Sequence, residues 1–164
     1  MESRAKAFGH PIHPMLIVFP LGLLATALGL DVAYAITERQ ALAVAAYWNI
    51  AIGVGAGLLA AVFGLIDWLG IPAGTRAKRI GLLHGLGNVV VLTLFTLAWL
   101  SRGETFYHEP RLVSLILEIT GGLLALVTGW LGGELVDRLG VGVDHDAHLD
   151  APSSLSGSVR PART

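Results

Sequence analysis

The stretch Gly9-His10-Pro11-Ile12-His13-Pro14 stands directly before the apolar run Met15 to Leu30, and this junction decides the fold. Proline lacks a backbone N–H and is favoured in the first turn of a helix, so Pro14 marks a helix start. Pro11 keeps the preceding segment extended. The sequence therefore predicts a rigid bend that carries two histidines and leads at once into a helix.

The composition is that of a membrane protein. Of the 164 residues, 54% are apolar and only 14% are charged, and the mean hydropathy is +0.67, far above the value of an ordinary soluble domain. The absence of cysteine excludes disulfides, iron–sulfur clusters and thiolate metal ligands. A net charge of -1 without a large Lys/Arg cluster argues against a nucleic-acid partner.

Four apolar runs approach or reach the length of about 20 residues that crosses a bilayer core. They span residues 15–36, 47–69, 80–100 and 112–131. We therefore predict an all-α fold, an integral membrane four-helix bundle. Its parts are a His/Pro-rich segment over residues 1–14, a four-span membrane domain over 15–143 and a disordered polar tail over 144–164. No long-period repeat is evident.

Basic residues predict the orientation. The N-terminal flank, the loop after the second span and the tail share one side, and they hold eight of the eleven Lys and Arg residues. The other side holds only Arg39, Arg102 and Arg111. Because basic residues concentrate on the cytoplasmic side of membrane proteins, both termini are expected to be cytoplasmic.

Polar residues from all four spans fall at this predicted cytoplasmic end. They are His10 and His13 before the first span, Asp67 at the end of the second, His84 and Asn88 in the third and Glu134 after the fourth. Ionisable groups within a bilayer are costly, so a convergent layer of them predicts a functional site. A thinner set, Asp31, His108 and Glu118, falls at the opposite end.

Glycines accompany the polar layer. Gly53 with Gly57, and Gly129 with Gly133, form two G-x-x-x-G pairs, a spacing that lets helix backbones approach closely in membranes. Gly85 adjoins His84, and Gly133 adjoins Glu134. Glycines beside polar residues are compatible both with tight helix packing and with room for a flat macrocycle beside its ligand.

One interpretation of the layer is a b-type haem. This cofactor needs one or two neutral imidazoles from different helices, between apolar walls. His10 or His13 together with His84, supported by Asn88, satisfies that demand, and the basic residues Arg76, Lys78 and Arg79 lie within reach of the propionates. Because both early histidines are expected to precede the first helix, the haem would lie shallow and partly exposed.

Three further interpretations stay open. One is a proton or ion pathway, for which the opposite membrane half offers only Asp31 and Glu118 to continue the route. A non-haem iron, manganese or zinc site would combine the histidines His10, His13 and His84 with the carboxylates Asp67 and Glu134. Alternatively, the layer binds no cofactor and only ties the helices together, as in a non-redox structural or assembly subunit. No serine nucleophile, phosphate loop or dinucleotide fingerprint is recognisable, so the sequence does not support a classical enzyme.

Several motifs occur together in this chain. They are GHPIHPML at 9–16, FPLG at 19–22, GLIDWL at 64–69, LHGLGN at 83–88, GWLGGELV at 129–136 and GVGV at 140–143. In combination they resemble the DUF2231 family of predicted bacterial membrane proteins, from Phe8 to Val143. The resemblance implies a multi-pass protein of the bacterial inner membrane. Some members are joined to Rieske-type ferredoxin domains, which suggests electron transfer and a redox partner of that kind. The preferred hypothesis is therefore a redox role.

Overall fold

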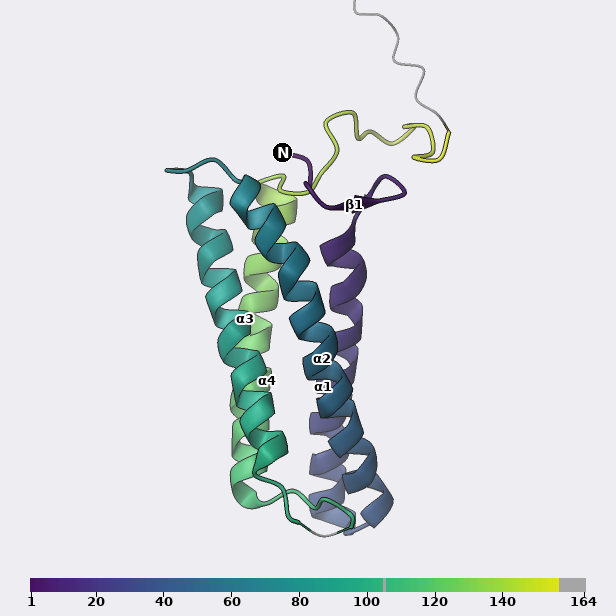
Figure 1. Ribbon diagram of the computed structural model, residues 1–164, viewed down its shortest axis with the longest axis vertical. Coiled ribbons are helices and arrows are strands. Elements are labelled where there is room, and N and C mark those ends of the chain that lie inside the picture. The colour runs from purple at the N-terminus through teal and green to yellow at the C-terminus, as the bar shows by residue number, and fades with distance from the viewer. Residues whose placement is uncertain (105, 157–164) are drawn as a thin grey trace, which may run out of the picture.

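Four long helices form an up-and-down bundle in the computed structural model, which describes residues 1–104 and 106–156 (Figure 1). The helices are α1 (Ile12–Thr37), α2 (Gln40–Gly70), α3 (Arg76–Leu100) and α4 (Leu112–Gly133). All four are long and apolar enough to cross a membrane, which confirms the predicted all-α four-span fold. The last part of the predicted disordered tail, residues 157–164, lies outside the described residues.

The predicted bend before α1 is a small β-hairpin that the sequence did not indicate. Strands β1 (Lys6–Ala7) and β2 (His10–Pro11) pair antiparallel, and the turn residues Phe8 and Gly9 have φ of 52° and 85°. Positive φ at both central residues is the signature of a type I′ turn, in which glycine is favoured. The hairpin projects over the start of α1 (Figure 1).

Helix α1 begins at Ile12, so Pro14 lies in its first turn as predicted. The expectation that His13 precedes the helix is wrong. The first helical residues have no intrahelical acceptor for their N–H groups, and a proline at this position therefore costs the helix nothing. His13 is consequently held on α1, whereas His10 lies in β2.

The helices form two hairpins, α1–α2 and α3–α4, that repeat the same contacts. A Cβ added at Gly53 of α2 would lie 2.8 Å from Leu24 of α1, and one added at Gly121 of α4 would lie 2.9 Å from Phe95 of α3. Leu24 and Phe95 both belong to the central core. The chain thus contains a structural repeat, with a shift of 71 residues from α1 to α3 (24 to 95) and of 68 from α2 to α4 (53 to 121).

The glycine pairs differ in what they do. Gly53 and Gly57 lie at close helix contacts, as predicted, because a Cβ at either position would meet Leu24 or Leu92 below 3.0 Å. The pair on α4 does not behave in this way. A Cβ at Gly129 would meet nothing within 4 Å, and one at Gly133 only the Asp137 carboxylate at 3.9 Å, so this second motif is not a close helix contact.

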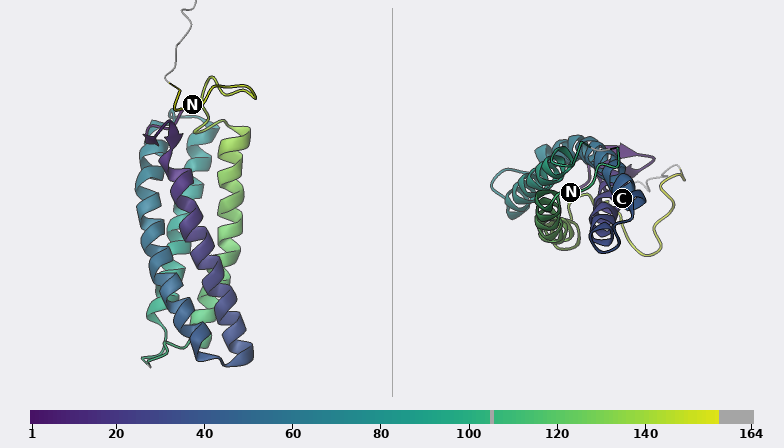
Figure 2. Two further views of the ribbon diagram at one scale, coloured as in Figure 1. Left: turned by 90° about the vertical axis from the view of Figure 1, so that its right-hand side faces the viewer. Right: turned by 90° about the horizontal axis from the view of Figure 1, so that it is seen from below.

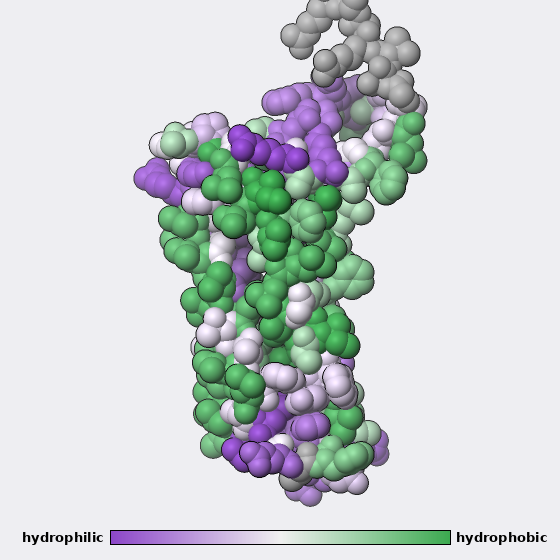
Figure 3. Space-filling model, viewed as in Figure 1, coloured by the Kyte–Doolittle hydropathy of each residue, from purple (hydrophilic) through white to green (hydrophobic). Residues whose placement is uncertain are grey.

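The outer surface suits a lipid environment. A broad apolar band lies between polar ends (Figure 3), and large side chains such as Leu58 and Leu126 are 58% and 73% exposed. A band of this size facing water would be a strong association site, whereas acyl chains cover it without cost. The buried core is small by comparison and consists of Leu24, Ala27, Ala46, Ile50, Val91 and Phe95.

Both ends of the described chain meet at one end of the bundle, called here the termini end (Figures 1 and 2). After α4 the helix widens into the π-helix η1 (Glu134–Arg138). The Met1 ammonium then donates to the Gly140 carbonyl at 2.8 Å, and the Gly142 N–H donates to the Met1 carbonyl at 2.8 Å. The opposite, loop end carries the α1–α2 and α3–α4 connections.

Candidate functional site

His13 and His84 occupy equivalent positions in the two hairpins near the termini end. His13 Nδ1 lies 2.9 Å from the Ala60 carbonyl of α2, and His84 Nδ1 lies 2.8 Å from the Thr128 carbonyl of α4. A main-chain carbonyl only accepts, so each Nδ1 donates a proton. In the neutral imidazole this places the free lone pair on Nε2, the nitrogen that is then available as a metal ligand.

Glycines make room for both rings. Gly64 of α2 and Gly132 of α4 lie one turn beyond the two carbonyls, and a Cβ there would lie 3.0 Å from the His13 ring and 3.1 Å from the His84 ring. Each imidazole therefore fills the place of a missing side chain on the partner helix. Both glycines belong to the motifs GLIDWL and GWLGGELV, so these motifs have a packing explanation.

Asn88 is fixed beside His84, as the sequence predicted from their one-turn spacing. The Thr128 hydroxyl donates to Asn88 Oδ1 at 3.0 Å, and this contact sets the orientation of the amide. Asn88 Nδ2 then faces His84 Nε2 at 3.2 Å and also donates to the His84 carbonyl at 3.0 Å. The amide is thus a donor toward the His84 lone pair, in agreement with the tautomer fixed by Thr128.

The two imidazoles belong to one polar layer. They are close enough to interact electrostatically, although one lies on α1 and the other on α3. Both are half-buried, and Thr128 beside them is buried. We call His13, His84, Asn88 and Thr128 the histidine layer. Its hydrogen bonds join the two helices within each hairpin, α1 to α2 through His13 and Ala60, and α3 to α4 through His84 and Thr128.

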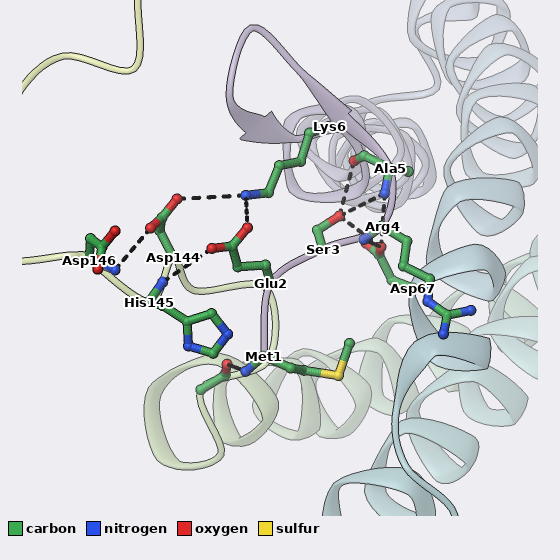
Figure 4. A network of polar contacts seen from close by, with 11 residues as sticks. Met1, Glu2, Ser3, Arg4, Ala5, Lys6, Asp67, Asp144, His145 and Asp146 are labelled. Atoms are coloured by element: carbon green, nitrogen blue, oxygen red, sulfur yellow. Dashed lines mark hydrogen bonds and ion pairs between the residues drawn. The ribbon is translucent and has the colours of Figure 1, made fainter. Parts of the chain in front are cut away.

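Asp67 binds the N-terminal segment instead of a histidine. Its Oδ1 accepts from the Ser3 hydroxyl at 2.7 Å and from the main-chain N–H groups of Arg4 and Ala5 at 2.8 and 3.3 Å (Figure 4). Three donors on one carboxylate oxygen hold residues 3–5 across the end of α2. This role explains the acidic residue of the GLIDWL motif without a cofactor.

The remaining predicted ligands also have other partners. Glu134 forms an ion pair with Arg76 at 2.6 Å, and the exposed His10 has its Nε2 3.2 Å from the Ser154 hydroxyl. Within residues 1–104 and 106–156, no group of three or more His, Asp and Glu side chains is arranged to hold a metal ion. The structure thus brings His13, His84 and Asn88 together and places His10, Asp67 and Glu134 in separate contacts.

Basic side chains surround the start of α3. The Thr75 hydroxyl caps the helix by accepting from the Lys78 N–H at 3.1 Å. The Lys78 ammonium donates to the Trp68 carbonyl at 2.7 Å and lies 3.9 Å from the centre of the Trp68 ring, a cation–π contact that fixes α2 to α3. Lys78 thus fixes the start of α3 to the end of α2 at the termini end.

An exposed ionic network joins the N-terminal segment to the residues after η1 (Figure 4). The Lys6 ammonium lies 2.6 Å from Glu2 and 3.6 Å from Asp144. Its hydrogen bond lowers the pKa of Glu2, and Glu2 in turn raises the pKa of Lys6. The pKa of Asp144 is lowered chiefly by the N–H of Asp146, which donates to its carboxylate.

The loop end holds a buried ionic cluster, of which the sequence showed only part. Asp31 and Glu118 were placed at this end, but Arg102 was interpreted as a loop charge. Its guanidinium is 1% exposed and donates from Nη2 to both carboxylates, at 3.1 Å in the case of Glu118. We call these three side chains the loop-end triad. Two carboxylates within apolar spans require a nearby cation, and this requirement was the signal available for Arg102.

The fold and these sites define a class of protein, a four-span integral membrane protein with a histidine layer near one end and a buried ionic triad near the other. The model of the family described as "Predicted membrane protein (DUF2231)" matches residues 9–145, and the chain belongs to this family. No curated protein and no solved structure matches the chain.

Proposed function

We propose that this protein is an electron-transfer component of the bacterial inner membrane that binds a b-type haem through His13 and His84. The observation that carries the proposal is the matched geometry of the two imidazoles. They lie on different hairpins at equivalent positions, and each donates from Nδ1 to a helix carbonyl. A b-type haem would be held by two neutral imidazoles of this kind, and the carbonyl contacts would fix the ring orientation and increase the basicity of the ligands.

The surroundings offer apolar surface rather than a formed haem pocket. An apolar groove of about 240 Å³ runs between α2 and α3, and neither His13 nor His84 is among the residues that line it. Arg76 and Lys78 lie at the same end, where the propionates of a haem would be expected, although Arg76 is paired with Glu134 and Lys78 donates to the Trp68 carbonyl. When bound, a haem would supply a one-electron couple, and the chain would supply the two histidine ligands and apolar surface.

Asn88 positions the ligand His84. Its amide faces the Nε2 lone pair at 3.2 Å, which is the position that a metal would take. The same amide nitrogen already lies 3.0 Å from the His84 carbonyl, so it keeps a hydrogen-bond acceptor when the lone pair is used for ligation. Asn88 therefore holds the imidazole in its ligating tautomer and is not itself a ligand.

A non-haem iron, manganese or zinc centre receives less support from the same geometry. Such a centre needs three or more protein ligands, and the carboxylates Asp67 and Glu134 are bound to the N-terminal segment and to Arg76. A haem needs only the two histidines. With both termini in the cytoplasm, the site would face a cytoplasmic electron donor, and a small redox protein such as a Rieske-type ferredoxin is the proposed partner.

One observation favours a second function, that of a non-redox structural or assembly subunit. Each polar side chain of the histidine layer already has a hydrogen-bond partner in the chain itself. The layer thus ties α1 to α2 and α3 to α4 without any cofactor. Under this second proposal, the two histidines only stabilise the bundle.

The test is an absorption spectrum of the detergent-purified protein, produced with ample haem, first oxidised by air and then reduced with dithionite. The redox proposal expects a Soret band and sharpened α and β bands on reduction, both lost in His13→Ala and His84→Ala and kept in the tail variant His148→Ala. Metal analysis of the same sample detects iron, manganese or zinc. A folded protein without haem or stoichiometric metal contradicts the redox proposal and supports the structural one.

A further inference from the structure

We infer that the loop-end triad binds one exchangeable proton, shared between the carboxyl groups of Asp31 and Glu118 and taken up from water on the loop side of the membrane. This inference is independent of the proposed haem, because the triad lies at the opposite end of the bundle. It assigns to Asp31, Arg102 and Glu118 the role of a proton-binding site.

The charge count is the first argument. The side chains of Asp31 and Glu118 are 0% exposed and that of Arg102 is 1% exposed. With both carboxyl groups ionised, the triad has a net charge of -1 in a water-excluded interior, where an uncompensated charge is strongly disfavoured. One bound proton makes the cluster neutral. Two carboxyl groups that share one site normally keep one of them protonated for the same reason.

The hydrogen-bond geometry is the second argument. Oxygen Oδ1 of Asp31 and oxygen Oε2 of Glu118 are buried without a hydrogen-bond partner among the described residues, although the two carboxyl groups are within hydrogen-bonding range of each other. Two carboxylates have no hydrogen to share. A proton on either group turns its hydroxyl into a donor to the other, and the acceptors of the pair are then satisfied.

The groups that face the triad come from all four helices or their ends. Arg102 also donates to the His108 carbonyl at 3.1 Å, and its Nη1 lies 3.4 Å from the Ala43 carbonyl of α2. These are neutral acceptors for Nη1 and add no charge, whereas the Nε–H group of Arg102 is buried without a hydrogen-bond partner in the described part of the chain. Among the ionised and titratable side chains, Asp31 and Glu118 interact with each other and with Arg102, and Tyr34 of α1 also lies close enough to interact with Asp31.

A pocket gives the triad a route to water. About 210 Å³ in volume, it lies at the loop end and is lined by Tyr47, Trp99, Arg102, His108 and the exposed Glu104, among others. The rings of Tyr47 and His108 stack 3.9 Å apart as one wall. Of the triad, Arg102 lines this pocket and the two carboxyl groups lie behind it. The proton therefore enters from water in the pocket beside Arg102 and reaches a carboxylate oxygen from there.

Infrared spectroscopy of the purified protein at neutral pH tests the inference. We expect the C=O stretch of one protonated carboxyl group, shifted in D₂O. The band should vanish both in Asp31→Asn and in Glu118→Gln, because the carboxylate left in each variant is neutralised by Arg102 alone. The exposed carboxylate Glu38 lies at the same end, so Glu38→Gln is the matched control and should keep the band.

Two results would overturn the inference. One is a folded wild-type protein without a protonated-carboxyl band at neutral pH, and the other is a band that remains in both triad variants. If the variants do not fold, ¹³C-labelled aspartate or glutamate in the wild type replaces them, and a band that neither label shifts also contradicts the inference. The chain lacks cysteine, so the variant Glu104→Cys can be labelled with a bulky maleimide that blocks the pocket. The label should slow the exchange of the carboxyl proton for deuterium, and an unchanged rate would exclude the pocket as the route of the proton.

Discussion

Arg102 forms an ion pair with Asp31, the residue at the equivalent position of the other hairpin, 71 residues earlier in the chain. The structural repeat thus places opposite charges where α1 and the end of α3 meet. Glu118 of α4 completes the cluster. Because lipid-exposed helices gain little from hydrophobic burial against one another, buried polar contacts of this kind carry much of the association between the hairpins.

Removal of the cation should destabilise the bundle strongly. Arg102→Met leaves Asp31 and Glu118 buried without their partner, and loss of one member of a buried ionic cluster costs about 3–5 kcal/mol. The measurement is the free energy of unfolding in detergent micelles. Adding Asp31→Asn and Glu118→Gln to the same chain should restore most of the loss. The matched control is Arg39→Met, at an exposed position of the loop end, and an effect of Arg102→Met equal to this control would contradict the prediction.

Gly132, beside the His84 ring, should be more sensitive to substitution by alanine than Gly85 and Gly129, where an added Cβ would meet no neighbour. A Cβ in Gly132→Ala would lie 3.1 Å from the His84 ring, which the Thr128 carbonyl holds in place. We expect this substitution to destabilise the protein by about 1 kcal/mol, as overpacking does, and to weaken any cofactor band. At Gly85 and Gly129 a Cβ meets nothing within 4 Å. There, alanine should stabilise the helix by up to about 1 kcal/mol. Equal effects at Gly132 and Gly85 would refute this account.

The sequence was sufficient for the four helices because hydropathy and length alone identify membrane spans. It also placed His84 beside Asn88, since residues four apart share a helix face. The hydrogen-bond or ion-pair partner of each polar side chain was harder to predict from the sequence. Depth in the membrane groups Asp67 and Glu134 with the histidines, but depth does not say which way a side chain points. Their partners, Ser3 and Arg76, come from segments whose path the hydropathy pattern does not determine.

The repeat shows why contacts were harder to predict than helices. His13 and His84 make the same contacts, although the residues around them share little identity and one follows a β-hairpin. The equivalence becomes visible only through Gly64 and Gly132, whose missing side chains accept the two rings. The motifs GLIDWL and GWLGGELV each contain a glycine one helical turn after the main-chain carbonyl that accepts from a histidine. This shared position is the sequence feature that relates the two motifs.

The Thr128 hydroxyl should determine the orientation of the Asn88 amide. Thr128→Val removes the 3.0 Å hydrogen bond to Asn88 Oδ1 while it preserves the shape of the buried side chain. Loss of one such hydrogen bond costs about 1 kcal/mol. The Thr128 carbonyl still accepts from His84 Nδ1 in this variant, so ¹⁵N NMR should show an unchanged His84 tautomer and shifted signals of the Asn88 side-chain amide. Thr128→Ser keeps the hydroxyl and should behave as the wild type, whereas unchanged Asn88 amide signals in Thr128→Val would show that Asn88 needs no such support.

The contact between the N-terminal segment and the tail should be lost at both pH extremes. The pKa values of Glu2 and Asp144 are lowered, so their contribution is present above the ordinary carboxyl range and disappears as pH falls through the lowered pKa values. The pKa of Lys6 is raised, so its contribution persists below the ordinary lysine value and disappears only above the raised one. Contact is therefore expected between about pH 5 and pH 10.

Spin labels on cysteines introduced at Ala7 and Ala147 would report this contact as a short distance between the labels, which lengthens at pH 2 and in Lys6→Met. A distance unchanged under both conditions would show that the main-chain pairing of Met1 with Gly140 and Gly142 holds the two segments without the charges.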